Sequence, residues 1–281
     1  QPKGAVARVY ANLTEMATGT TVLVPVDTLR TNLQTEQSVS ETTPAPLLPG
    51  TEYRYEIVVA TSVDSVTSEA ETFVTNPSAP VAAADSVSGV TDTGATLYGT
   101  VNPGGDTTAV QFVYHPSGTP SAADTVLAAN SPVDSTADRM VSSPVDGLDE
   151  GTTYDFTVRA GNSADTTEAA PESFKTLSVR LATRPDTAGQ RIVQVGQEGQ
   201  RDSVTVENQG EATLTALDAR LEGTGADAFR MVGDDLEGQP GGLAPGETRL
   251  LEVAFAPSVP GAQSARLVVA AAEGGGGRTG L

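Results

Sequence analysis

The 281-residue chain contains no cysteine and no tryptophan, and it has a single histidine. Disulfide bonds and thiolate metal sites are therefore excluded, and each folded unit must be held together by its own packed core. A β-sandwich of about 100 residues can bury enough apolar surface to fold without such links. The lack of cysteine is thus compatible with an extracellular protein.

Basic residues are scarce as well. The chain has 36 acidic side chains against 16 basic ones, which gives a formal net charge of −20, and Lys3 and Lys175 are its two lysines. A surface this negative repels nucleic acid and anionic membranes, so we expect neither as a partner. The carboxylates are spread along the chain, which resembles the surfaces of proteins from salt-loving organisms; an ordinary soluble acidic surface is the alternative interpretation.

Long apolar runs are missing. The sequence contains no stretch of about 18 apolar residues, which is the length that a membrane-spanning helix needs. The first four residues, Gln-Pro-Lys-Gly, lack the apolar core of a secretion signal. We expect this segment to have no direct membrane insertion and to be a mature or internal piece of a larger protein.

Few residues could carry chemistry. His115 has no second histidine or cysteine with which to build a catalytic triad or a zinc site. Residues 275–280 have the glycine spacing of a dinucleotide-binding loop, but no strand–helix unit surrounds them. The acidic clusters at 234–237 and 146–150 lack the spaced aspartates of a calcium loop and are interpreted as solvated turns. We predict no catalytic residue, no cofactor and no bound metal.

An internal repeat organises the first 176 residues. The stretch around Tyr53 matches the stretch around Tyr154, which lies 101 residues further along the chain, and the same offset relates Gly50 to Gly151. Self-similarity at a fixed offset indicates repeated structural modules. The sequence therefore contains two visible copies of one module.

The second copy has the alternation of a β-strand. Tyr154, Phe156, Val158 and Ala160 alternate with polar residues, which is the pattern of a strand with one buried face. A helix would scatter these apolar residues around its circumference. Further strands are expected at residues 95–101, 109–114, 125–129, 173–177, 201–208 and 248–256. Short strands separated by Gly, Pro, Asn and Asp predict an all-β fold of tandem antiparallel sandwiches.

The motif Leu-x-Pro-Gly-Thr-x-Tyr that ends at Tyr53, followed by alternating apolar residues, resembles the late strands of a fibronectin type III domain. Residues 96–105 are similar to the early strand and turn of bacterial versions of that domain. The resemblance implies that Tyr53 and Tyr154 are tyrosine-corner residues, which pack the ring in the sandwich and bond the hydroxyl to backbone. It covers roughly residues 1–176. The missing tryptophan departs from many animal members, so an aliphatic core is expected in its place.

The resemblance implies fibronectin III-like domains at residues 1–76 and 77–176. In this alignment Pro2 and Gly4 correspond to Pro103 and Gly105, so the first copy lacks its first two strands. These strands either lie outside the given sequence or come from a neighbouring subunit by strand complementation. Both alternatives stay open at this point.

Residues 177–281 resemble a different module, an ASPM/SPD-2/Hydin-type immunoglobulin-like domain. Four blocks carry the resemblance: Ser203 to Gly210, Gly225 to Phe229, Leu243 to Glu247 and Val253 to Pro257. A helical turn is expected near residues 225–231. The resemblance implies a sandwich that lacks its last strand, with residues 273–280 forming a loop.

Linkers are expected at residues 76–80 and 176–184. Pro77 and Pro80 restrict the first linker, which favours a stiff, extended rod. These features favour a non-catalytic extracellular or cell-surface segment of a modular bacterial stalk or filament protein, whose partners are copies of itself or neighbouring domains. Two alternatives remain: an adhesin or carbohydrate-binding arm, and the accessory domains of a larger secreted enzyme.

Overall fold

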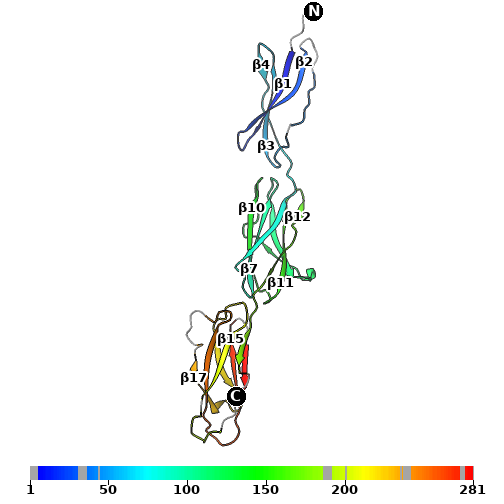
Figure 1. Ribbon diagram of the computed structural model, residues 1–281. Helices are drawn as coiled ribbons and strands as arrows, with labels where there is room; N and C mark the ends of the chain where they lie inside the picture. Colours follow the sequence, from blue (N-terminus) through cyan, green and yellow to red (C-terminus); the bar gives the residue numbers. More distant parts are fainter. Residues whose placement is uncertain are drawn as a thin grey trace, which may run out of the picture.

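The computed structural model describes residues 6–30, 37–43, 45–185, 192–199, 201–234, 236, 242–272 and 276–280. The fold is all-β, with antiparallel strand pairing in each sheet, as the alternating pattern predicted. Figure 1 shows the strands gathered into three units that follow one another end to end in a rod-like arrangement. Within the described residues, the structure contains no helix that is long and apolar enough to cross a membrane.

The first unit is a single sheet in the order β2-β1-β3-β4, with β5 also paired to β3. Its strands are β1 (Val6–Glu15), β2 (Thr21–Arg30), β3 (Glu52–Ala60), β4 (Ser65–Thr67) and β5 (Glu71–Val74). The core of this unit is small: it consists of Leu13, Val24 and Tyr53, against which Leu47 and Tyr55 pack in part.

The middle unit is a sandwich of two sheets. One has the order β10-β7-β6, and the other has the order β12-β11-β8-β9 with β13 also paired to β11. Its elements are β6 (Val81–Ser88), β7 (Gly94–Asn102), β8 (Ala109–Pro116), the 3₁₀ turn η1 (Pro120–Ala122), β9 (Asp124–Leu127), β10 (Arg139–Asp146), β11 (Thr153–Gly161), β12 (Thr166–Glu168) and β13 (Glu172–Lys175). Leu97, Phe112 and Phe156 fill the space between the sheets and are fully buried.

The third unit is also a two-sheet sandwich, with the orders β14-β15-β18-β17 and β16-β19-β20. Its elements are β14 (Leu181–Arg184), β15 (Arg201–Asn208), β16 (Asp218–Glu222), the 3₁₀ turn η2 (Ala226–Ala228), β17 (Phe229–Asp234), β18 (Thr248–Phe255), β19 (Arg266–Ala270) and β20 (Gly276–Gly280). Val204, Leu251 and Leu267 are fully buried between these sheets.

Two expectations about irregular segments are wrong. Residues 276–280, expected to belong to a loop, form β20 and pair antiparallel with β19. Their backbone groups can complete the ladder beside β19 although the segment is rich in glycine. The second linker is shorter than expected, because Leu181–Arg184 forms β14 and pairs with β15. Leu181 and Thr183 alternate inward and are buried there, and this burial decides the conformation.

Candidate functional site at the joints between sandwiches

Tyr53 and Tyr154 occupy matching places in the first and middle units. Tyr53 lies in β3, where its phenol oxygen accepts a hydrogen bond of 3.0 Å from the backbone N–H of Leu48. Tyr154 lies in β11, where its phenol oxygen accepts one of 2.9 Å from the N–H of Asp149. Both tyrosine side chains are buried. Each tyrosine therefore holds the loop that precedes its own strand.

Each of these rings also stacks on a phenylalanine of the last strand of its unit. The ring centroids of Tyr53 and Phe73 are 5.8 Å apart with an interplanar angle of 22°. Tyr154 and Phe174 are likewise 5.8 Å apart, at 21°. The repeat seen in the sequence is therefore a repeat of side-chain packing, and it fixes the position of the loop relative to the strand that leads into the next linker.

A threonine just before each linker also forms hydrogen bonds with the loop that the tyrosine of its unit holds. The hydroxyl of Thr176 accepts a hydrogen bond of 2.9 Å from the N–H of Thr152 and donates one of 2.6 Å to the carbonyl oxygen of Asp149. Thr75 makes the equivalent pair of bonds in the first unit, with Thr51 and Leu48. Each loop is thus tied both to its tyrosine and to the base of the linker.

The first linker is held by backbone groups and one amide side chain of the middle sandwich. The N–H of Ser78 donates to the carbonyl oxygen of Gly104 at 3.0 Å. The side-chain amide of Asn162 donates to the carbonyl oxygens of Ser78 and Pro103, at 2.8 Å in each case. The linker between β5 and β6 is therefore attached to two loops of the middle sandwich.

The first and middle units touch through glycine backbone. A Cβ atom on Gly50 would lie 1.8 Å from the carbonyl oxygen of Gly105, and a Cβ on Gly105 would lie 2.2 Å from the carbonyl oxygen of Pro49. Both glycines have positive φ, +58° and +80°. Any side chain here would separate the two backbones, so this close contact depends on glycine at both positions.

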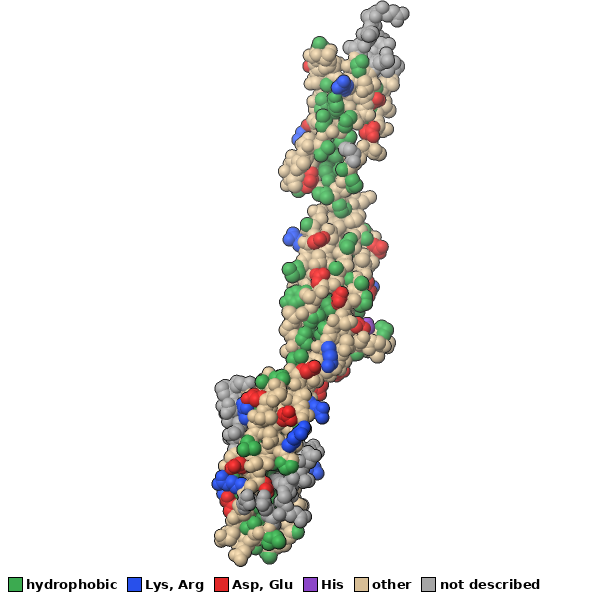
Figure 2. Space-filling view, viewed as in Figure 1, with side chains coloured by type: hydrophobic (Ala, Val, Ile, Leu, Met, Phe, Trp, Pro, Cys, Tyr) green, Lys and Arg blue, Asp and Glu red, His purple; other side chains and the backbone are tan. Residues whose placement is uncertain are grey.

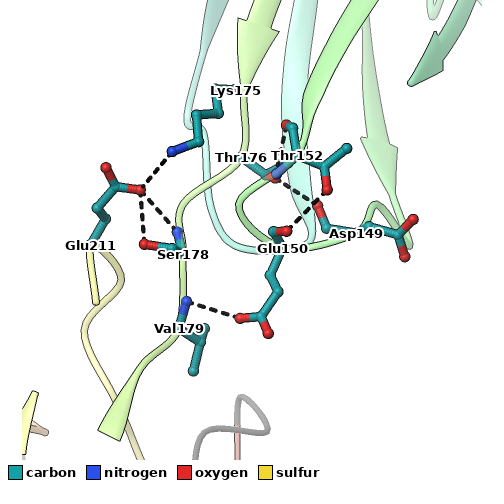
Figure 3. Close-up of polar contacts among 8 residues, drawn as sticks. All are labelled: Asp149, Glu150, Thr152, Lys175, Thr176, Ser178, Val179 and Glu211. Atoms are coloured by element: carbon teal, nitrogen blue, oxygen red, sulfur yellow. Dashed lines mark hydrogen bonds and ion pairs between the residues drawn. The ribbon is translucent and has the colours of Figure 1, made fainter. Parts of the chain in front are cut away.

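The second linker is held by two carboxylates, one from each flanking sandwich (Figure 3). Glu150, in the loop held by Tyr154, accepts a hydrogen bond of 2.9 Å from the N–H of Val179. Glu211, from the third sandwich, accepts bonds of 3.1 Å from the N–H of Ser178 and 3.0 Å from its hydroxyl. The ammonium group of Lys175 lies 3.5 Å from the same Glu211 oxygen. Consecutive linker residues are therefore bound from both sides.

Backbone bonds reinforce the second joint. The carbonyl oxygen of Ser178 accepts from the N–H groups of Glu211 and Ala212, at 2.8 and 3.1 Å, and that of Arg180 accepts from Gln209 at 2.7 Å. On the other side, the N–H of Leu177 donates to the carbonyl oxygen of Thr91 at 2.9 Å. The linker is thus bonded to both neighbouring sandwiches over most of its length.

The second joint favours the charged form of the Glu211 carboxyl group over the neutral form. The backbone N–H and the hydroxyl of Ser178, together with the charge of Lys175, lower the pKa of Glu211 below its ordinary value of 4.5. Hydrogen bonds and a nearby cation stabilise the charged form of a carboxyl group. The joint therefore contains a titratable contact that is charged at neutral pH.

We expect the second joint to loosen in acid. The pKa of Glu211 is lower in the folded joint than in the free group. Its contribution to the stability of the joint is therefore fully present above pH 4.5 and is lost as the pH falls through the lowered pKa. The chain has no cysteine, so fluorescent dyes on Met140→Cys and Val259→Cys report the distance across the joint. The distance distribution should broaden in acid, and Glu211→Gln should broaden it already at pH 7.

Glu247 gives a matched control for this titration. The N–H of Ala244 and the guanidinium of Arg249 also lower the pKa of Glu247. Both of these partners belong to the third unit, so the contacts do not cross the joint. The Glu247→Gln variant should leave the distance across the joint unchanged at pH 7. Equal broadening in both variants would contradict a specific role for Glu211.

The other residues singled out in the sequence do not converge on a site. The Nδ1 atom of His115 lies 3.0 Å from the carbonyl oxygen of Pro116 in β8. Among the residues described, no group of three histidine or acidic side chains could hold a metal ion. Asp235 and Glu237 of one acidic cluster, and Gly275 of the glycine run, lie outside the described residues.

Sequence reasoning missed the joint residues. Glu150 was interpreted as part of a solvated turn, and Glu211 was not singled out. Their partners are local to the linker but 29 and 33 residues away in sequence, so no short-range pattern connects them. The one available signal was the repeat itself, which places Glu150 beside the motif glycine Gly151 in the loop before Tyr154.

No family model matches this chain, and no curated protein matches it. Among solved structures, it is similar over its full length to the FN1–FN3 domains of chicken CNTN1, with 13% identity, 89% of that chain covered and a TM-score of 0.41. The sensor domain of the anti-sigma factor RsgI4 of Pseudobacteroides cellulosolvens matches 35% of this chain and 95% of its own, with 24% identity and a TM-score of 0.27. These scores are low, so the assignment of tandem fibronectin III-like sandwiches depends on the strand order and pairing described above.

Proposed function

We propose that this chain is a non-catalytic extracellular spacer, a structural segment of a modular bacterial surface stalk or filament protein. In this proposal the chain is divided into modules at residues 1–76, 77–176 and 177–281. Its task is mechanical: it holds whatever lies at its two ends a fixed distance apart.

The observation that carries the proposal is the construction of the two joints. At the second joint, Glu150 and Glu211 bind adjacent linker residues from opposite sides. At the first joint, Gly50 and Gly105 bring two backbones into contact. A chain that needed independent domain motion would gain nothing from such contacts, since relative motion is the default for small interfaces between domains. Stiff joints are what a spacer requires.

We further propose that the third module is of the ASPM/SPD-2/Hydin type. Two of the sequence blocks that motivate this assignment meet in the core through Asn208, which is fully buried. Its side-chain amide donates hydrogen bonds of 2.8 Å to the carbonyl oxygens of Ala212 and Leu243. A buried amide that satisfies carbonyls from two loops explains why both blocks occur together.

Two measurements test the proposed function. Antibodies raised against this chain should label intact cells that produce the parent protein, and treatment of those cells with protease should remove the label. Negative-stain images of the parent protein should show rods or fibres. Labelling that requires permeabilised cells, or compact isolated particles in the images, would contradict the proposal.

A further inference from the structure

The first joint depends on a loop that is distant from the linker in sequence. The side-chain amide of Asn162, in the loop between β11 and β12, donates hydrogen bonds to the carbonyl oxygens of Ser78 and Pro103. The side-chain oxygen of Asn162 accepts bonds from the N–H groups of Ala164 and Asp165, at 2.9 and 3.2 Å. Its own loop therefore orients the Asn162 side chain, and the hold of Asn162 on the linker depends on where that loop lies.

The loop between β11 and β12 is exposed. Ser163, Ala164 and Asp165 are all exposed to solvent. A loop without buried apolar side chains is held by its hydrogen bonds alone, and such segments belong to the least stable parts of a protein. The position of Asn162 therefore needs a polar tether to a more rigid part of the sandwich.

One carboxylate supplies this tether. Asp106 lies in the loop between β7 and β8, and its Oδ2 atom accepts a hydrogen bond of 3.1 Å from the N–H of Ser163, the residue next to Asn162. Its Oδ1 atom accepts one of 2.8 Å from the N–H of Thr107 in its own loop. The two oxygens of Asp106 thus bind the two loops to each other.

The loop that carries Asp106 is well fixed. The hydroxyl of Thr108, which is fully buried, donates to the carbonyl oxygens of Pro103 and Asp106, at 3.1 and 3.0 Å. The N–H of Gly105 donates to the carbonyl oxygen of Ser135 at 3.1 Å. A buried hydroxyl and a second loop therefore hold the base to which the exposed loop is tied.

The same chemistry occurs at the second joint. There Glu211 accepts hydrogen bonds from the N–H and the hydroxyl of Ser178. At the first joint, the hydroxyl and the N–H of Ser163, together with the N–H of Thr107, lower the pKa of Asp106 below its ordinary value of 3.8. Each joint therefore has a carboxylate that takes both donors of one serine, and hydrogen bonds of this kind stabilise the charged form.

A few bonds are enough to decide the mobility of the first joint. In the space-filling view, the first and middle units meet over a narrow part of the rod (Figure 2). Relative motion is the default for small interfaces between domains. The bonds that hold the linker therefore determine how far the first unit can swing.

We propose that Asp106 is a positioning residue of the first joint, which keeps the Asn162 amide on the linker by tying the exposed β11–β12 loop to the fixed β7–β8 loop. This inference rests on the proposed spacer function, in which a stiff first joint is required. Asp106 acts through Asn162, because the bond that it accepts from the exposed loop comes from Ser163, the neighbour of Asn162.

Dyes on Val66→Cys and Met140→Cys, which are exposed positions in the two units, measure the distance across this joint. Asp106→Ala should broaden the distance distribution by about twofold or more, because the joint returns to the mobility that is usual for small interfaces. Asp106→Asn keeps one acceptor oxygen and should broaden it less. Asn162→Ala should broaden it as much as Asp106→Ala does, and the double variant should broaden it no further, because residues that act through one contact are not additive.

Asp155 gives a matched control inside the same sandwich. Its carboxylate also accepts serine hydroxyls, from Ser117 at 2.8 Å and from Ser173 at 2.7 Å. It lies near the start of β11, at the opposite end of that strand from Asn162. Asp155→Ala should therefore leave the distance distribution across the first joint unchanged.

Hydrogen exchange over residues 153–161 distinguishes positioning from a loss of stability. In Asp106→Ala the exchange there should stay as it is in the unaltered chain while the distance distribution broadens. The inference is overturned if Asp106→Ala leaves the distribution narrow, if Asp155→Ala broadens it equally, or if the broadening occurs only together with faster exchange. It is also overturned if Asp106→Ala and Asn162→Ala add to each other. A distribution that is already broad in the unaltered chain would contradict the stiff joint of the proposed function, and this inference with it.

Discussion

The Phe156→Ala variant is expected to lower the free energy of unfolding of the middle sandwich by about 3–5 kcal/mol. The Phe156 side chain is 1% exposed, and its ring lies 6.4 Å from that of Phe112 and 6.2 Å from that of Phe174. Removing it leaves a cavity between two sheets that cannot close without moving strands. Because small domains have total stabilities of about 5–15 kcal/mol, this loss leaves the middle sandwich partly unfolded under mild conditions.

The repeat supplies a matched control. Tyr55 is the counterpart of Phe156 in the first unit, where it is partly exposed and packs only at the margin of the small core. Tyr55→Ala should therefore cost less than half as much. Hydrogen exchange in increasing urea, followed over residues 153–161 and 52–60, measures each loss in its own unit. Equal losses at the two positions would contradict the difference in packing.

The Gly105→Ala variant is expected to open the first joint. A Cβ atom at this position would lie 2.2 Å from the carbonyl oxygen of Pro49, far inside the contact distance, so the two units must move apart. The positive φ of +80° adds a strain of about 1–2 kcal/mol within the turn. Dyes on Val66→Cys and Met140→Cys, both exposed positions in the two units, should report a longer and broader distance.

Gly118 separates the steric effect from the backbone strain. It has nearly the same φ, +82°, but a Cβ added there would meet nothing within 4 Å. Gly118→Ala should therefore produce a similar local strain without any change in the distance between the dyes. If Gly105→Ala also left the distance unchanged, the glycine contact would not be what holds the first joint.

The sequence predicted the fold class through residues whose neighbours decide their conformation locally. Tyr154 to Ala160 alternate, and they lie in β11; residues 201–208 were predicted with the bounds that β15 has. The repeat also placed Tyr53 and Tyr154 in equivalent positions, and each accepts a bond from the N–H group five residues before it. Alternation and repetition are local or periodic signals, and such signals are visible in one sequence.

The segments that were predicted wrongly take their conformation from distant partners. Glycine-rich β20 is a strand because β19 offers it a free edge. Leu181–Arg184 is a strand because β15 pairs with it and the third core buries Leu181. The joints follow the same rule, since Gly50 meets Gly105 and Glu211 meets Ser178 across long stretches of chain. Tertiary contacts of this kind leave no local pattern.

Small-angle X-ray scattering of the intact chain at neutral pH tests the central claim, that the three units are held in line by stiff joints. Strands of nine residues, such as β11, are about 30 Å long, so three units in line give a rod of about 90 Å and a radius of gyration of about 27 Å. A compact globule of this length would have a radius of gyration of about 19 Å. The account predicts the larger value, with a scattering profile typical of a rod. A value near 19 Å, or a profile typical of freely jointed beads, would contradict it.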